Sequence, residues 1–379
     1  MKRFLVCIGL FFLFASAARG ENLDSALSSA LDSLALDPWE NAWKTLLPEG
    51  ENLRSVLLSI ARGEIHLDGE SLLRRLGEEL LSDISLSSFR CVQLMAPAVF
   101  CGILQRIKSA FSRSALGEYI NAACYLLLAG VMAADLGTHM QLAHESIIRL
   151  SDLMQALFPL LLTLLAAVGG TAGAAFFQPA VVAACGTMTA LVRHVTLPLA
   201  LSAAVTAILN HLSRHMRLGK LSALLKSAAA WTLGVSFTVF ISVNALKSLS
   251  AAAADGISIR TAKYAVDHFV PVVGGMFADT MDTLVGASLL IKNALGLTGL
   301  LLLLLTAAGP MLQTLSAVIL YRACAALLEP VADGDICACI QDFSDMLMLL
   351  FIIQLSVGAM FLLLVAQMLV VGNLTVMLR

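Results

Sequence analysis

Charged side chains are scarce in this sequence. Only 13% of its 379 residues are Asp, Glu, Lys or Arg, whereas a typical soluble domain has about 25%. Hydrophobic residues make up 59% of the chain, and the formal net charge is -2. This composition excludes an ordinary soluble domain. Without a strongly basic surface, nucleic acid is not an expected partner.

Recognisable catalytic motifs are lacking as well. The sequence contains no His-Glu-x-x-His zinc helix, no Gly-x-Ser-x-Gly nucleophile turn and no glycine-rich phosphate loop with its lysine. We therefore expect no enzyme activity, no cofactor and no metal site. Any step driven by ATP would need a separate subunit.

Long uncharged runs dominate what is present. Residues 346–371 contain no charged side chain, and a bilayer core about 30 Å thick needs roughly 20 apolar helical residues. The sequence therefore predicts an all-α polytopic membrane protein with about seven to nine transmembrane helices, some of them broken or re-entrant. The expected spans are 89–107, 119–136, 154–177, two short spans within 181–212, 228–246, 285–308, 311–328 and 346–371.

The N-terminus has the pattern of a cleaved signal peptide. Lys2 and Arg3 precede an apolar run at 4–14, and the small residues Ala15-Ser16-Ala17 follow it. A short basic segment, a short apolar run and a small-residue cleavage site define such a peptide. The alternative is an uncleaved first membrane helix.

Three regions are therefore expected. The signal peptide occupies residues 1–17. An extracytoplasmic polar segment of short amphipathic helices covers 18–88, where leucines recur at helical spacing. The multi-span membrane domain covers 89–379. The polar segment is either a helical spacer or a docking surface.

Charged loops predict how the spans are oriented. Basic residues cluster at 106–113 and 214–226, acidic residues cluster at 329–345, and Arg379 ends the chain. Cytoplasmic loops carry an excess of Lys and Arg. With the N-terminus outside and nine spans, both basic clusters and the C-terminus lie inside and the acidic loop lies outside.

Ionisable residues inside membrane spans are functional hypotheses by default. Lys292 and Asn293 lie early in the span 285–308. They suggest a pore-lining or subunit-pairing site, and the alternative is a lysine that extends its ammonium to the headgroups. Arg193 lies between the two expected halves of 181–212, where it marks either a polar break facing a cavity or an interfacial loop.

Gly169, Gly170 and Gly173 form a small-residue cluster at the end of the span 154–177. Small residues let two helices approach closely, so a tight helix crossing is one interpretation. The other is a helix broken at membrane depth, as transporters use at their binding sites.

Pro271, Gly274 and Gly275 follow an amphipathic stretch with basic and aromatic side chains. Such a stretch suits the membrane interface. The sequence predicts an interfacial helix here that bends at the proline and the glycines into the span 285–308.

Several strings in the sequence closely resemble the stage III sporulation protein AE family, and the resemblance covers most of the chain from Phe89 onward. The polar N-terminal segment carries no matching motif. The strings are Asp255–Lys263, Phe269–Gly275, Ser288–Ala294 with Gly296 and Gly299, Pro159–Leu164 with Gly169-Gly170, Gln178-Pro179, Leu197–Leu199 and Ala326–Pro330.

The resemblance implies a non-enzymatic integral membrane subunit of an endospore-forming bacterium, located in the mother-cell membrane that surrounds the forespore. Its implied partners are the lipid bilayer, the other proteins of the same sporulation operon, including a secretion-type ATPase subunit, and indirectly a forespore-side channel protein. Together they would form a channel or secretion-like complex. The family supplies no catalytic residues to assign. The alternative function is a stand-alone secondary transporter or permease with a midplane site, which an inverted repeat would favour.

Overall fold

The computed structural model describes the five long helical segments and parts of the N-terminal region. The described residues are 40, 43–44, 52–62, 74, 77–78, 80–84, 92–93, 95–103, 116–167, 171–212, 218–269, 274–330, 332 and 334–377. Within these ranges all regular structure is helical. The predicted signal peptide at 1–17 lies outside them.

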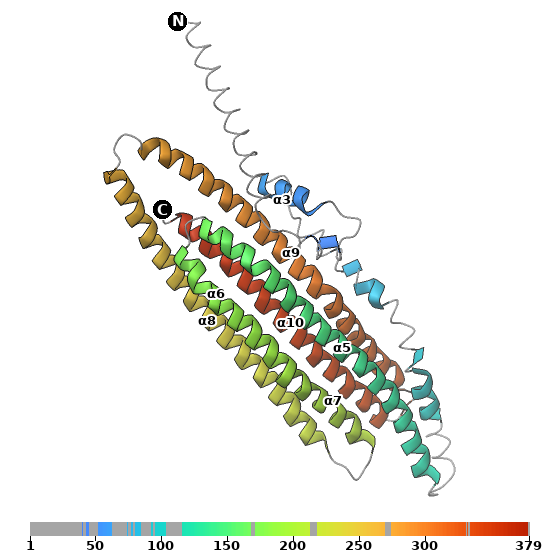
Figure 1. Ribbon diagram of the computed structural model, residues 1–379. Coiled ribbons are helices and arrows are strands. Elements are labelled where there is room, and N and C mark those ends of the chain that lie inside the picture. The colour runs from blue at the N-terminus through green and yellow to red at the C-terminus, as the bar shows by residue number, and fades with distance from the viewer. Residues whose placement is uncertain are drawn as a thin grey trace.

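The long helices lie side by side in an antiparallel bundle (Figure 1). Segments α6, η1 and α7 continue directly into one another. The described part of the bundle therefore has five long helical rods, which are α5, the continuous α6–η1–α7, α8, α9 and α10. The expected all-α fold class is confirmed. The bounds are α3 Leu53–Arg62, α5 Leu116–Ala167, α6 Thr171–Leu191, η1 Val192–Thr196, α7 Leu197–Leu212, α8 Gly219–Phe269, α9 Gly274–Leu328 and α10 Gly334–Met377.

Each rod contains a segment that is long and apolar enough to cross a membrane. These segments are Ala123–Ala166, Cys185–His211, Gly219–Lys247, Gly286–Leu328 and Gly334–Val371. A helix rises about 1.5 Å per residue, so the 52-residue α5 is about 78 Å long. That length is more than twice a bilayer core of about 30 Å, and parts of the rods must lie beyond it.

Two predicted boundaries between spans are wrong. Helix α5 runs without a break through the polar residues between the predicted spans 119–136 and 154–177. Helix α9 likewise contains Pro310, where a turn was expected. Proline removes one backbone hydrogen bond and bends a helix, but its flanking turns still pair. Hydropathy reflects the surroundings of a helix. The hydropathy of the sequence falls in the middle of α5, but the backbone hydrogen bonding of the helix continues.

The expected break within 181–212 is a wide helical turn. Residues Val192–Thr196 form a single π-helical segment, in which the Leu197 N–H bonds to the Val192 carbonyl. Pro198 follows directly, and its ring has no N–H to donate and crowds the preceding turn. A local i→i+5 turn is a common way for a helix to absorb such a residue. The prediction of two broken halves is therefore wrong.

The basic cluster at 214–226 and the acidic cluster at 329–345 lie at the same end of the bundle, so their predicted placement on opposite membrane faces is wrong, while the basic cluster at 106–113 lies outside the described residues (Figure 1). The prediction put three spans between these loops, whereas the structure has two helices, α8 and α9. Ion pairs join the two regions. His211 lies 2.9 Å from Asp342, and Lys226 lies 3.4 Å from Asp345. The opposite charges therefore compensate one another at one end of the bundle.

Part of the polar N-terminal segment packs on the bundle. Helix α3 contacts α9, and Leu53 and Leu57 are both buried. These two leucines lie four residues apart, on one face of the helix. Burial of a leucine side chain stabilises by about 1.5 to 3 kcal/mol. This face anchors α3, and which side of the membrane the segment occupies stays a prediction.

Candidate functional site

Lys292 is buried between α9 and α10. Its side chain is 1% exposed, and its ammonium donates a hydrogen bond to the Leu369 carbonyl at 3.1 Å. A lysine that reaches the headgroups would expose its charged tip. The structure therefore favours a lysine that joins two helices over the headgroup-reaching alternative.

Gly296 explains why α10 can come so close to Lys292. It lies one turn away on the same face of α9, and a Cβ atom at this position would sit 2.8 Å from Cγ of Leu369. A residue with a side chain there would require Leu369 or α10 to shift. Gly296 belongs to a string that resembles the family, but its role at the site depends on Leu369 of α10 and so is not visible in the sequence.

Two more polar side chains lie at this level of the bundle. Within the described part of the chain, the Asn293 Oδ1 and Gln367 Oε1 atoms are buried without a hydrogen-bond partner. A buried unsatisfied polar atom costs about 1 to 3 kcal/mol. Lys292, Asn293 and Gln367 are called the Lys292 layer below.

A second buried polar group connects α5, α9 and α10. The Tyr321 hydroxyl donates to Asp135 Oδ2 at 2.8 Å, and His139 Nε2 lies 3.7 Å from the same oxygen. The Tyr321 ring meets Phe343 edge-on, with 4.8 Å between ring centroids. His139 is 2% exposed. We call Asp135, His139 and Tyr321 the Asp135 layer.

Polar side-chain pairs on α7, α8, α9 and α10 lie near the level of the Asp135 layer at the surface of the bundle. Asp345 pairs with both Lys226 and Arg322, at 3.4 and 3.2 Å, and His211 pairs with Asp342. Exposed pairs of this kind contribute only about 0 to 1 kcal/mol each. Their main consequence is positional, because they mark where the apolar surface of the bundle ends.

The Asp135 layer was not predicted from the sequence. Asp135 was read as a boundary residue at the end of a span, since its partner Tyr321 lies 186 residues further along the chain. The spacing of four between Asp135 and His139 puts both on one helix face. That spacing was the available signal.

The other predicted site residues do not join the Lys292 layer. Arg193 is half-buried within η1, and its Nε atom is buried without a partner among the described residues. Gly173 lies inside α6 and is not at a break in the described helix. Gly169, Gly170 and Pro271 lie outside the described residues.

Gly274 and Gly275 are the first two residues of α9. The stretch before them, predicted to be a separate interfacial helix, is the C-terminal part of α8, which extends to Phe269. The hydropathy of α8 changes along its length, but its backbone does not break. The chain therefore reverses direction between Phe269 and Gly274.

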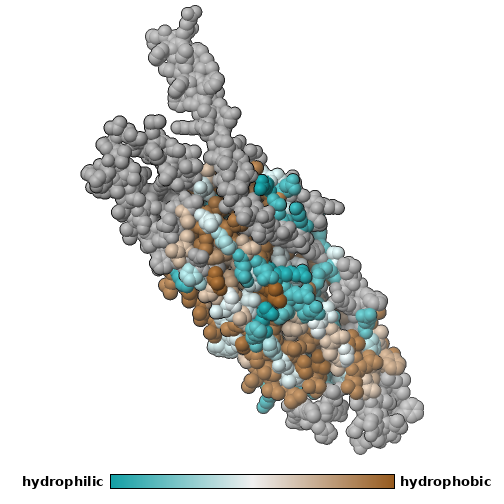
Figure 2. Space-filling model, viewed as in Figure 1, coloured by the Kyte–Doolittle hydropathy of each residue, from teal (hydrophilic) through white to brown (hydrophobic). Residues whose placement is uncertain are grey.

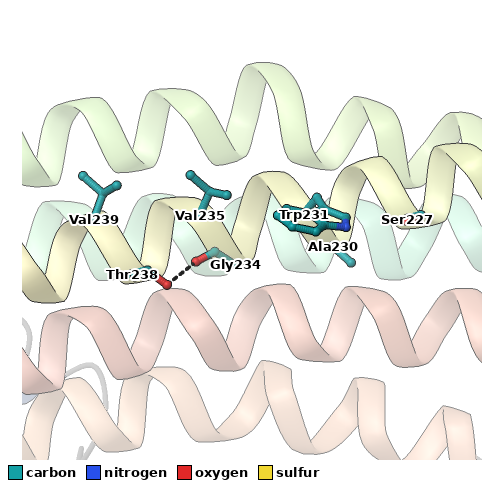
Figure 3. A pocket seen from close by; sticks show the side chains of 7 residues that line it. All are labelled: Ser227, Ala230, Trp231, Gly234, Val235, Thr238 and Val239. Atoms are coloured by element: carbon teal, nitrogen blue, oxygen red, sulfur yellow. Dashed lines mark hydrogen bonds between the residues drawn. The ribbon is translucent and has the colours of Figure 1, made fainter.

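A shallow hollow of about 580 Å³ lies on the outer face of α8 (Figure 3). All its lining residues come from this one helix, and the Thr238 hydroxyl bonds back to the Gly234 carbonyl at 2.9 Å. Trp231 is 72% exposed. The hollow is one-sided and apolar, as expected of a face turned toward lipid. It is lined by Ser227, Ala230, Trp231, Gly234, Val235, Thr238 and Val239.

In the described part of the chain, no three His, Cys, Asp or Glu side chains lie together so that they could hold a metal ion. The polar side chains with recorded interactions between helices occur instead as small groups. Besides the two layers, Thr314 donates to Gln354 at 3.4 Å. Such groups fix the register of α9 against α10.

The fold and its buried polar layers define a multi-pass, all-α membrane protein. Comparison with known proteins narrows the class. The family model for stage III sporulation protein AE matches residues 51–372, and the chain belongs to this family. Stage III sporulation protein AE of Bacillus subtilis (strain 168) is 31% identical over 334 residues, covering 88% of this chain and 83% of that protein. No solved structure matches the chain.

Family membership makes this a sporulation-related membrane protein. The resemblance noted in the sequence strings is thereby confirmed. The comparisons give no support to the alternative of a stand-alone secondary transporter.

Proposed function

We propose that the chain is a non-enzymatic membrane subunit of a channel or secretion-like complex that joins the mother cell to the forespore during endospore formation. It would lie in the mother-cell membrane around the forespore. Its partners would be the other proteins of its operon, including a secretion-type ATPase subunit, and indirectly a forespore-side channel protein. Membership of the stage III sporulation protein AE family supports this placement.

The observation that carries the proposal is the buried Lys292 in a bundle of membrane-length helices. Ionisable side chains within transmembrane segments are rare, mostly face the bundle interior and mark ion pathways, relays or assembly contacts. The ammonium has three donor hydrogens, and the Leu369 carbonyl accepts one of them. A purely lipid-anchoring bundle has no need of such a group, whereas a working subunit of a complex does.

The test uses sporulating cells that carry a tagged copy in place of the native protein. Lys292→Met keeps the length of the side chain and removes its charge, and Lys292→Arg keeps the charge. Lys220→Met, at an exposed position near the start of α8, is the matched control. Protein level, position around the forespore and late forespore gene expression are measured for each.

We expect deletion of the protein to abolish late forespore expression. Lys292→Met should reach the forespore membrane at a normal level and still lose expression, while the Lys220 variant keeps it. Normal late expression in the deletion strain would contradict the proposed function. Loss of the Lys292→Met protein itself would assign the lysine to folding, and the deletion result would then decide the function.

A further inference from the structure

Helix α5 carries a polar stripe on its exposed face. Its members recur every three or four residues, which places them on one side of a helix. Arg149 and Glu145 are 68% and 44% exposed, and hydrophilic side chains gather over this part of the molecule in Figure 2. The members, called the α5 stripe below, are Thr138, Gln141, Glu145, Arg149, Asp152 and Gln155.

The opposite face of α5 is apolar and forms part of the core. Ala143, Ile147, Leu150 and Met154 are essentially fully buried. The stripe spans 17 residue steps, or about 26 Å at 1.5 Å per residue. Helix α5 is therefore two-sided along the middle of its length, with one face packed in the bundle and the other ionic.

Hydrogen bonds within the stripe involve only part of its polar groups. Glu145 accepts from Gln141 Nε2 at 2.9 Å and from Arg149 Nη2 at 3.3 Å. A guanidinium carries five donor hydrogens and a carboxylate about four acceptor positions. The exposed remainder of these groups needs water or another polar surface.

Contacts between helices fix the level of the stripe within the bundle. Asp135 touches Tyr321, and Tyr321 packs on Phe343, so these residues lie at one level. Counting upward from Asp135 on α5 and from Phe343 on α10, the stripe at 138–155 lies beside 346–363. That part of α10 has no charged residue.

The outer face of α8 at the same level is apolar. Lys226 pairs with Asp345, which places the following turns of α8 level with the stripe. The large side chains exposed there are Trp231, Val235, Val239 and Val243, part of the face shown in Figure 3. At one depth the bundle is therefore apolar over α8 and ionic over α5.

Contact between lipid and the α5 stripe would be energetically unfavourable. A charged residue at the centre of a membrane helix is unfavourable even on insertion scales. Three charged residues of the stripe, Glu145, Arg149 and Asp152, lie about 15 to 26 Å beyond Asp135 along the helix. They are too far from that end to reach the interface by extending their side chains.

We propose that the α5 stripe faces a water-filled space at bilayer depth and forms one wall of an aqueous conduit, closed against lipid by other subunits. This inference rests on the proposed function and adds the lining helix to it. Neighbouring charges of both signs, Glu145 and Asp152 around Arg149, suit water and small polar solutes. They do not select ions of one sign.

The test measures water access directly by cysteine modification. The native cysteines are first replaced, and the cysteine-free protein is shown to support sporulation. Gln141→Cys and Asp152→Cys probe the stripe, and Val235→Cys and Val239→Cys on α8 are controls at the same level. Assembled membranes from sporulating cells are treated with a charged, membrane-impermeant methanethiosulfonate, which reacts with the thiolate and so requires hydration.

We expect the stripe positions to react at least roughly tenfold faster than the α8 positions, because the thiolate forms only where water solvates it. Equal rates at the two sets would overturn the inference. If both sets are fast, this level lies outside the bilayer. If both are slow, the stripe is covered by protein.

The labelling result can be distinguished from the result of the test of the proposed function. Fast modification of the stripe, combined with normal late expression in the deletion strain, would keep the aqueous face and reject the channel role. Slow modification combined with a defective deletion strain would reject the aqueous face and keep the channel role. Labelling is scored on protein of normal abundance, so a variant that fails to accumulate is replaced by Gln155→Cys on the same face.

Discussion

Gly296 offers a direct test of the close approach between α9 and α10. A methyl group added by Gly296→Ala would overlap the Leu369 side chain, at 2.8 Å from Cγ and 3.0 Å from Cδ1. Rotation of the terminal methyl groups alone does not clear Cγ. The whole Leu369 side chain or α10 itself must therefore shift, and this shift would disturb the neighbouring bond from Lys292 to the Leu369 carbonyl.

Overpacking of this kind costs about 1 to 3 kcal/mol. The same substitution gains about 1 kcal/mol in helix propensity, because alanine is the better helix former. Gly234→Ala on α8 isolates the two effects, since nothing lies within 4 Å of a Cβ built at Gly234. The difference in unfolding free energy between the two variants should therefore equal the packing strain of about 1 to 3 kcal/mol.

The assay is thermal unfolding of the purified protein in detergent. The measured quantity is the fraction of protein that remains monodisperse at each temperature. Gly234→Ala should unfold at or above the temperature of the wild type, and Gly296→Ala below that of Gly234→Ala. Equal unfolding temperatures for the two alanine variants would refute the close approach of α10 to Gly296.

Two further predictions concern polar side chains. Tyr321→Phe removes the donor to the Asp135 carboxylate and should lower the unfolding free energy by about 1.5 to 3 kcal/mol, measured in the same assay; no loss would show that the Asp135 layer is already solvated. Burial raises the pKa of Asp83, so the folded state holds this proton more tightly than the unfolded state, and stability falls as pH rises through the acid range. Asp83→Asn should therefore raise the unfolding temperature at pH 7 and leave it nearly unchanged at pH 3; an equal effect at both pH values would contradict the assignment.

The sequence predicted the helical class and the apolar segments well, because membrane thickness imposes a length that can be counted directly. It predicted helix continuity poorly. The polar residues in the middle of α5 were taken as a loop, yet Gln141, Glu145 and Arg149 support one another at a spacing of four. Side-chain polarity reports the surroundings of a helix, and the α5 stripe shows that a change in surroundings need not end the backbone hydrogen bonding.

The key side chains are buried by residues on other helices, and the sequence alone does not show which residues these are. Lys292 was singled out because an ionisable residue within an apolar run is visible in any sequence. Its carbonyl partner on α10 lies 77 residues further on, and the role of Gly296 follows only from the position of Leu369. The orientation of the loops failed for a related reason, since an error of one helix in the count exchanges the two membrane faces.

The two polar layers agree with a single bilayer. From Phe343, beside Tyr321, to Leu369, beside Lys292, α10 rises about 39 Å at 1.5 Å per residue. A bilayer with its headgroups is about 40 to 45 Å thick, so both layers fall near the interfaces. Figure 1 shows α8 and α9 extending past the neighbouring ends of α5, α6 and α10.

The part of the α8–α9 hairpin beyond the Lys292 layer therefore projects from the membrane. From Gly274 to Lys292, α9 alone extends about 27 Å past that layer. The string Asp255–Lys263, which is part of the family resemblance, lies in the section of α8 beyond this level. Part of the family resemblance therefore falls on helix ends beyond the two polar layers, whereas the α5 stripe lies between those layers on the exposed face of α5.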